Sequence, residues 1–195
     1  MRFSARDIAY ASVFAALAVV AAMLVRYGSQ VVPFSLLPLV AMLAGAMLGS
    51  RLGAISMIIY VLIGLAGLPV FARPPYGGLT YVFQPTFGFL LGFAGGAGVA
   101  GFVVERSRRP TLAGYLVACL AGLVAIYTLG VAYLWAIFNL YLGKPEAVPG
   151  LLKGMIPLLG LDLVKALVAA SLARAVAARF PARRLYAASR KDAAG

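Results

Sequence analysis

The stretch GMIPLLGLDLVKALVAASLA, residues 154–173, carries no charge apart from Asp162 and Lys165. A helix of about 20 such residues, rising about 1.5 Å per residue, crosses the roughly 30 Å of hydrocarbon in a bilayer. The stretch therefore predicts a transmembrane helix. The two charges within it need an explanation, because each costs about 2.5–3.5 kcal/mol near the bilayer centre.

Five further apolar runs precede this one. Together they predict six spans, at about residues 8–25, 31–49, 52–72, 80–104, 111–142 and 154–173. The composition agrees, since 64% of the 195 residues are hydrophobic and 11% are charged, against about 45–50% and about 25% in soluble domains. We expect an all-α membrane protein, with residues 1–195 forming one integral membrane domain built as a six-helix transmembrane bundle.

The basic residues indicate how the bundle is oriented. Most of the 17 Lys and Arg residues fall on the side that holds both chain ends. The positive-inside rule then places both termini in the cytoplasm, with residues 179–195 as a basic cytoplasmic tail. Orientation and attraction to membrane lipid headgroups also explain the net charge of +12, so no nucleic-acid partner is expected.

Several classes of function are excluded by the residues that the chain lacks. The sequence has no His, one Cys and five acidic residues, which excludes Ser-His catalysis and His-ligated zinc and makes a carboxylate metal cluster improbable. The G-x-G-x-x-G match at 96–101 lies inside a predicted span and indicates helix packing, and no phosphate-binding G-x-x-x-x-G-K-[ST] motif is present. We expect no catalytic residue, no metal and no cofactor.

Asp162 and Lys165 form the main candidate site. Three residues apart, they share one helix face, at depths of about 12 and about 16 Å if the span begins near Gly154. One interpretation is that the two charges neutralise each other and fix how the helices pack. The other is that they form a polar ligand site. Lys suits a carboxylate and Asp accepts from N–H groups, so the site would suit a small molecule with an acid at one end and an amide-like group at the other.

A second candidate group lies where the fourth span begins on the outer side. Glycines there allow close approach, and polar atoms among aromatic rings are typical of a small-molecule pocket. The alternative is that these are ordinary boundary residues. The Pro- and Gly-rich segment 68–78 before them resembles a lid. The group comprises Gly78, Tyr81, Gln84, Thr86 and Phe89, with Asn139 of the fifth span as a further candidate.

The first predicted span carries a stripe of small residues, Ala11, Ala15, Ala18 and Ala22, on one face. Such a stripe lets another helix approach closely in lipid. The partner is either a helix of this chain or a separate membrane subunit.

Four segments, with Gly77-Gly78, carry a resemblance to a known family. They are LAGAMLGSRLGA at 43–54, GLAGLPVFA at 64–72, PTFGFLLGF at 85–93 and the D-x-x-K pair at 162–165. They resemble the BioY family, the biotin-specific substrate-binding (S) components of energy-coupling-factor (ECF) transporters. The resemblance runs from about residue 8 to 178.

The resemblance implies a subunit that captures biotin at the outer face of a prokaryotic cell membrane and performs no chemistry. It implies that Lys165 pairs with the biotin carboxylate and that Asp162 accepts from the ureido N–H groups. It also implies that a coupling transmembrane subunit, docked on the alanine stripe, and two ATPase subunits are partners.

The chain departs from the usual family pattern in two places. Leu37 stands where the pattern has Gln, and Phe87 and Phe89 interrupt a usual P-T-G-G-Y motif. These departures keep open an S component for another small carboxylated vitamin. Two further alternatives are an intramembrane enzyme that uses Asp162 or Lys165, and a pure assembly protein.

Overall fold

The computed structural model describes residues 4–28, 35–107, 111–143 and 148–179. These residues form helices and connecting turns, without a strand, which confirms the all-α expectation for the described part of the chain. The elements are α1 (Ala5–Gly28), α2 (Leu37–Leu48), α3 (Ser50–Leu65), the 3-10 helix η1 (Leu79–Phe83), α4 (Phe87–Arg106), α5 (Leu112–Ala136), the π-helical turn η2 (Ile137–Tyr141) and α6 (Val148–Arg179).

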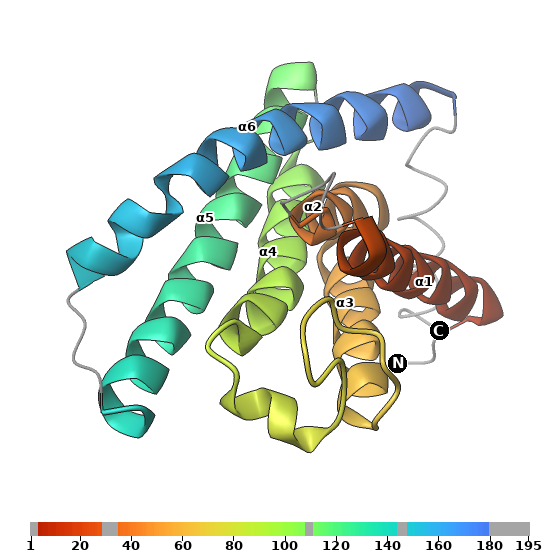
Figure 1. Ribbon diagram of the computed structural model, residues 1–195. Coiled ribbons are helices and arrows are strands. Elements are labelled where there is room, and N and C mark those ends of the chain that lie inside the picture. The colour runs from red at the N-terminus through yellow and green to blue at the C-terminus, as the bar shows by residue number, and fades with distance from the viewer. Residues whose placement is uncertain (1–3, 29–34, 108–110, 144–147, 180–195) are drawn as a thin grey trace.

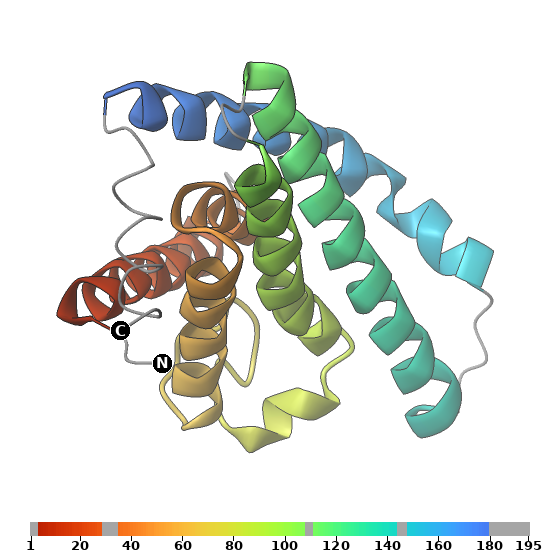
Figure 2. The same cartoon turned by 180° about the vertical axis from the view of Figure 1, so that it is seen from behind.

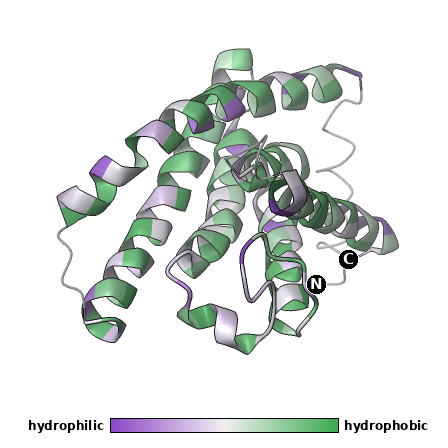
Figure 3. Ribbon diagram, viewed as in Figure 1, coloured by the Kyte–Doolittle hydropathy of each residue, from purple (hydrophilic) through white to green (hydrophobic). Residues whose placement is uncertain are grey.

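Four of the described helices are long and apolar enough to cross a membrane: α1, α4, α5 continued through η2, and α6. Helices α2 and α3 are equally apolar but have 12 and 16 residues. Most of the helical ribbon is hydrophobic in Figure 3, and large apolar side chains such as Val13, Leu17 and Val164 are exposed. Apolar side chains on both the inner and outer faces of a helix are typical of a membrane bundle.

Among the helix boundaries that differ from the ranges expected for the spans, the end of α3 and the start of α4 define a loop. Helix α3 ends at Leu65, and Gly67 follows with a φ of 105°, the left-handed conformation that commonly terminates a helix. Helix α4 begins at Phe87 because Pro85 disfavours helical geometry at the residue before it, and Gln84 is extended. The segment 66–86 is therefore a structured loop. All of the predicted basic tail except Arg179 lies outside the described residues.

Helix α4 lies at the centre of the arrangement. It packs against α5, α3 and α2, while α1 packs on α3 and α2. Helix α6 contacts α5 and α2 and crosses the bundle near one end of α4 and α5 (Figures 1 and 2). Backbones approach closely where small residues meet: a Cβ added to Gly45 would lie 2.1 Å from the carbonyl oxygen of Ala97.

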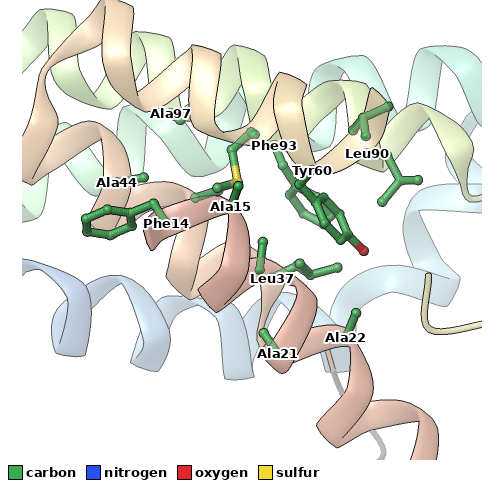
Figure 4. Packing of buried hydrophobic residues seen from close by; sticks show 14 of the residues in the cluster. Phe14, Ala15, Ala21, Ala22, Leu37, Ala44, Tyr60, Leu90, Phe93 and Ala97 are labelled. Carbon is green, nitrogen blue, oxygen red and sulfur yellow. The ribbon is translucent and has the colours of Figure 1, made fainter. Parts of the chain in front are cut away.

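The buried side chains form two cores. The first joins α1, α2, α3, α4 and the loop 66–86, and Figure 4 shows Leu37, Tyr60 and Phe93 within it. The second joins α2 and α4 to α5 and α6 and is rich in alanine, including Ala118 and Ala169. Since α2 contributes to both, this short helix connects the two halves of the molecule.

The alanine stripe of α1 faces the first core. Ala11, Ala15, Ala18 and Ala22 are all buried, and the last three share a cluster with residues of α2 and α3. Figure 4 shows Ala15, Ala22 and Leu37 as members of this cluster. Helices of the same chain therefore cover the stripe, which favours the first of the two partners expected from the sequence.

Candidate functional site

Two charged residues of α6, Asp162 and Lys165, form a buried ion pair. Lys165 Nζ lies 2.6 Å from Asp162 Oδ1, and the two residues are only 8% and 6% exposed. They begin the buried stripe of α6, which continues through Ala166 and Ala169, whereas most of the helix before them is exposed. The pair thus lies where α6 first meets the rest of the bundle.

Two further groups complete this site, and the sequence reasoning missed both. The Tyr127 hydroxyl of α5 donates to Asp162 Oδ2 at 2.8 Å, and Lys165 Nζ donates to the backbone carbonyl of Ser35 at 2.6 Å. We call Ser35, Tyr127, Asp162 and Lys165 the polar cluster. One signal could have pointed to Tyr127: a tyrosine in the middle of an apolar span needs a partner for its hydroxyl.

The polar cluster joins three separate parts of the chain: α5, α6 and the residues before α2. Each oxygen of the Asp162 carboxylate accepts from one protein donor, Lys165 on Oδ1 and Tyr127 on Oδ2. A carboxylate has about four lone-pair sites, so acceptor capacity remains for N–H groups of a ligand. Within the described residues, no buried side-chain nitrogen or oxygen lacks a hydrogen-bond partner.

Phe89 is the member of the second candidate group that borders the polar cluster. Its ring stands nearly perpendicular to that of Tyr127, with centroids 6.1 Å apart. Gly130 of α5 makes room for it, since a Cβ there would lie 2.3 Å from the Phe89 ring. Phe89 therefore supports Tyr127 from α4.

Other members of the second group belong to the loop 66–86. Tyr81 is buried, and its ring centroid lies 4.3 Å from that of Phe71. The Gly78 amide donates to the Gly64 carbonyl at 2.8 Å. These contacts place the residues in the packing of the loop itself, apart from the polar cluster.

Gln84 and Asn139 are half-buried and make local hydrogen bonds. The Gln84 amide donates to the Tyr81 carbonyl at 3.0 Å. The Asn139 side chain donates to the Trp135 carbonyl, one turn earlier on the same helix, also at 3.0 Å. These bonds help to shape the loop and the end of α5.

The segment 68–78, predicted to resemble a lid, is held to neighbouring helices by several contacts. Phe71 is buried, with its ring 5.7 Å from that of Tyr60 and nearly perpendicular to it. At the end of α1, the Arg26 guanidinium lies 3.8 Å from the centroid of the Tyr76 ring and donates to the Pro69 carbonyl at 3.1 Å. The loop is therefore held to both α3 and α1.

The two positions that depart from the family pattern are explained by packing. Leu37 is 4% exposed and Phe87 is 5% exposed, and both belong to the first core. The Phe87 ring also meets the Tyr133 ring edge-on, with centroids 5.7 Å apart. Apolar side chains suit both places.

Metal ligation has no basis in the described residues, since no group of three or more His, Cys, Asp or Glu side chains there could hold an ion. The polar cluster contains one carboxylate and one ammonium group. Such a cluster can bind a small polar molecule through hydrogen bonds and charge.

Comparison with known proteins gives a consistent result. The family model described as "BioY family" matches residues 1–182. The chain is 43% identical over 136 residues to "Probable biotin transporter BioY" of Lysinibacillus sphaericus, covering 70% of this chain and 68% of that protein. It is 34% identical over 192 residues to "Biotin transporter BioY" of Rhizobium etli, covering 91% and 96%.

A solved structure shares the fold. The crystal structure of the S-component for biotin from an ECF-type ABC transporter matches with a TM-score of 0.71 and 19% sequence identity, covering 90% of this chain and 94% of that one. The family match over nearly the whole sequence, the similarity to relatives and the arrangement of the helices agree, and the chain therefore belongs to the BioY family.

Proposed function

We propose that this chain is the substrate-binding subunit of an ECF-type transporter and captures biotin. The observation that carries the proposal is the buried Asp162–Lys165 pair, which lies in a stretch of α6, residues 154–173, that is otherwise uncharged. A buried ion pair is weak support for stability, because an apolar pair of similar size often serves as well or better. Binding of a polar ligand is a better reason for placing the two charges there.

The chemistry of biotin suits this site. Its ureido group offers N–H donors beside a carbonyl acceptor, and its valerate chain ends in a carboxylate. The side chains of Asp162 and Lys165 are 2.6 Å apart, so they cannot reach opposite ends of one biotin while they stay in contact. Both are therefore assigned to the ureido end, with Asp162 accepting from N–H and Lys165 donating to the carbonyl. Contact of Lys165 with the carboxylate would require the pair to open.

The proposal includes a membrane topology. The chain spans a prokaryotic cell membrane six times as one integral domain over residues 1–195, with both termini and the basic tail at 179–195 in the cytoplasm. The distribution of Lys and Arg supports this orientation. A coupling subunit and two ATPase subunits supply the energy for transport, and the coupling subunit docks on a surface other than the buried alanine stripe.

The test is equilibrium binding of labelled biotin to the purified chain in detergent. We expect tight binding by the parent and a loss of at least about tenfold, or 1.4 kcal/mol, in both Asp162→Ala and Lys165→Ala. Lys153→Ala is the matched control, because Lys153 is an exposed lysine on the same helix. If both variants still bind biotin tightly, the binding site lies elsewhere in the protein.

Biotin methyl ester separates the two poses, because it keeps the ureido group and lacks the carboxylate charge. If Lys165 contacts the ureido end, Lys165→Ala weakens binding of the ester and of the acid by equal factors. If Lys165 contacts the carboxylate, the substitution abolishes any preference of the parent for the acid over the ester. Failure of a folded parent to bind biotin, with binding of another carboxylated vitamin, would favour the alternative ligand.

A further inference from the structure

Within the polar cluster, Tyr127 comes from a different helix than the ion pair. Asp162 and Lys165 lie on α6, whereas Tyr127 lies on α5 and donates to the carboxylate oxygen that Lys165 does not contact in the pair, at 2.8 Å. The two oxygens of one carboxylate are thus held by donors from two helices. This arrangement fixes the plane of the carboxylate as well as its position.

The orientation of Tyr127 is itself determined by packing. The Phe89 ring stands at 86° to the Tyr127 ring, and the missing side chain of Gly130 provides the space that Phe89 occupies. Phe89 of α4 thus packs against Gly130 and Tyr127 of α5, and Tyr127 in turn donates to the Asp162 carboxylate on α6. Without the Tyr127 hydroxyl, the carboxylate could rotate and offer both oxygens to Lys165.

Filling of space between helices would not by itself require the Tyr127 hydroxyl. Burial of the tyrosine ring among apolar side chains would be served equally well by phenylalanine. The hydroxyl instead adds a second donor to a carboxylate that already has a counter-ion at 2.6 Å. The remaining lone pairs of that carboxylate then point in defined directions, and they can accept only from a hydrogen-bond donor.

We propose that Tyr127 is a positioning residue for ligand specificity: it holds the Asp162 carboxylate so that its remaining lone pairs receive N–H donors of the ligand. The inference rests on the proposed function, because it takes the ureido N–H groups of biotin as those donors. Tyr127 acts through Asp162 and need not touch the ligand.

The test measures the effect of Tyr127→Phe on the binding of two ligands, once with Asp162 present and once with Asn at that position. Biotin and an analogue methylated at its ureido nitrogens are titrated into the parent, Tyr127→Phe, Asp162→Asn and the double variant, all in detergent. The parent should prefer biotin, and Tyr127→Phe should reduce that preference by about tenfold, as expected for loss of a hydrogen bond to a charged group. In the Asp162→Asn background, Tyr127→Phe should change the preference by less than about twofold.

Tyr115→Phe is the matched control, since Tyr115 is a second tyrosine of α5 and lies buried in the second core. It should leave the preference unchanged. Equal preference in Tyr127→Phe and the parent would overturn the inference, as would fully additive effects of Tyr127→Phe and Asp162→Asn. Binding of biotin by the parent is read in the same titration. Its absence would refute the proposed function itself, together with the inference that depends on it.

Discussion

The two regions around Tyr60 and Tyr127 use the same side chain for different purposes. Tyr60 is fully buried in the first core, and its hydroxyl donates to the backbone carbonyl of Val70 at 3.3 Å. The Tyr127 hydroxyl donates to the Asp162 carboxylate at 2.8 Å. A neutral hydrogen bond contributes about 0.5–1.5 kcal/mol and one to a charged group about 1.5–3 kcal/mol. The first bond holds the loop 66–86 to α3, while the second orients the Asp162 carboxylate.

The same contrast extends to the neighbours of each tyrosine. Around Tyr60 the partners are the Phe71 ring and backbone atoms of the loop 66–86. Around Tyr127 they are a carboxylate and, beyond it, an ammonium group. Substitutions in the first region should therefore change stability, and substitutions in the second should change both stability and binding.

The largest effect is expected from Lys165→Ala. This change leaves the Asp162 charge buried without its counter-ion, and breaking a buried pair costs about 3–5 kcal/mol. The double variant Asp162→Ala/Lys165→Ala removes both charges and should be more stable than Lys165→Ala alone, although both variants should bind biotin at least about tenfold more weakly than the parent. Thermal unfolding in detergent measures the difference. A double variant less stable than Lys165→Ala would contradict this account of the polar cluster.

Gly64→Ala should have the next largest effect, confined to stability. An added Cβ would lie 2.1 Å from Cζ of Phe71, so the ring must shift, and overpacking of this kind costs about 1–3 kcal/mol. Gly154→Ala is the control, because nothing lies within 4 Å of a Cβ at that helical position. Helix propensity should make the control neutral or slightly stabilising. Equal melting temperatures for the two variants would show that Phe71 does not hold the loop.

The smallest effect is expected from Tyr60→Phe. Its hydrogen bond is long and neutral, so its loss should cost no more than about 1 kcal/mol of stability. Biotin affinity should stay within about twofold of the parent. If Tyr60→Phe reduced the preference for biotin over the methylated analogue as much as Tyr127→Phe does, the distinction between the two regions would be wrong. The two variants should be measured side by side in the same detergent.

The sequence was informative wherever the deciding interaction is local. Runs of apolar residues predict the helices, and the spacing of Asp162 and Lys165 places them on one face, where the structure finds them in contact. The start of α4 is also determined locally, because Pro85 disfavours helical geometry at Gln84, which is extended. A span that begins at about residue 80 does not take this proline into account, and α4 begins at Phe87.

Partners that are distant in the chain could not be predicted. Tyr127 lies 35 residues before Asp162, and Ser35 lies 130 residues before Lys165. Helical periodicity gives the face of one helix and carries no information on which residue of another helix will meet it. The alanine stripe shows the same limit: small residues such as Ala18 indicate that something packs closely, without identifying α2 and α3.

The placement of both charges on one helix bears on how the protein is made. Because Asp162 and Lys165 are three residues apart, they neutralise each other as soon as α6 forms, before it packs against any other helix. A lone charge entering the bilayer costs about 2.5–3.5 kcal/mol, and a segment that carries its own counter-ion avoids much of that penalty. The bond from Tyr127 forms only once α5 and α6 associate. Insertion of the last helix therefore does not depend on the finished site, and the site is completed by assembly of the helices.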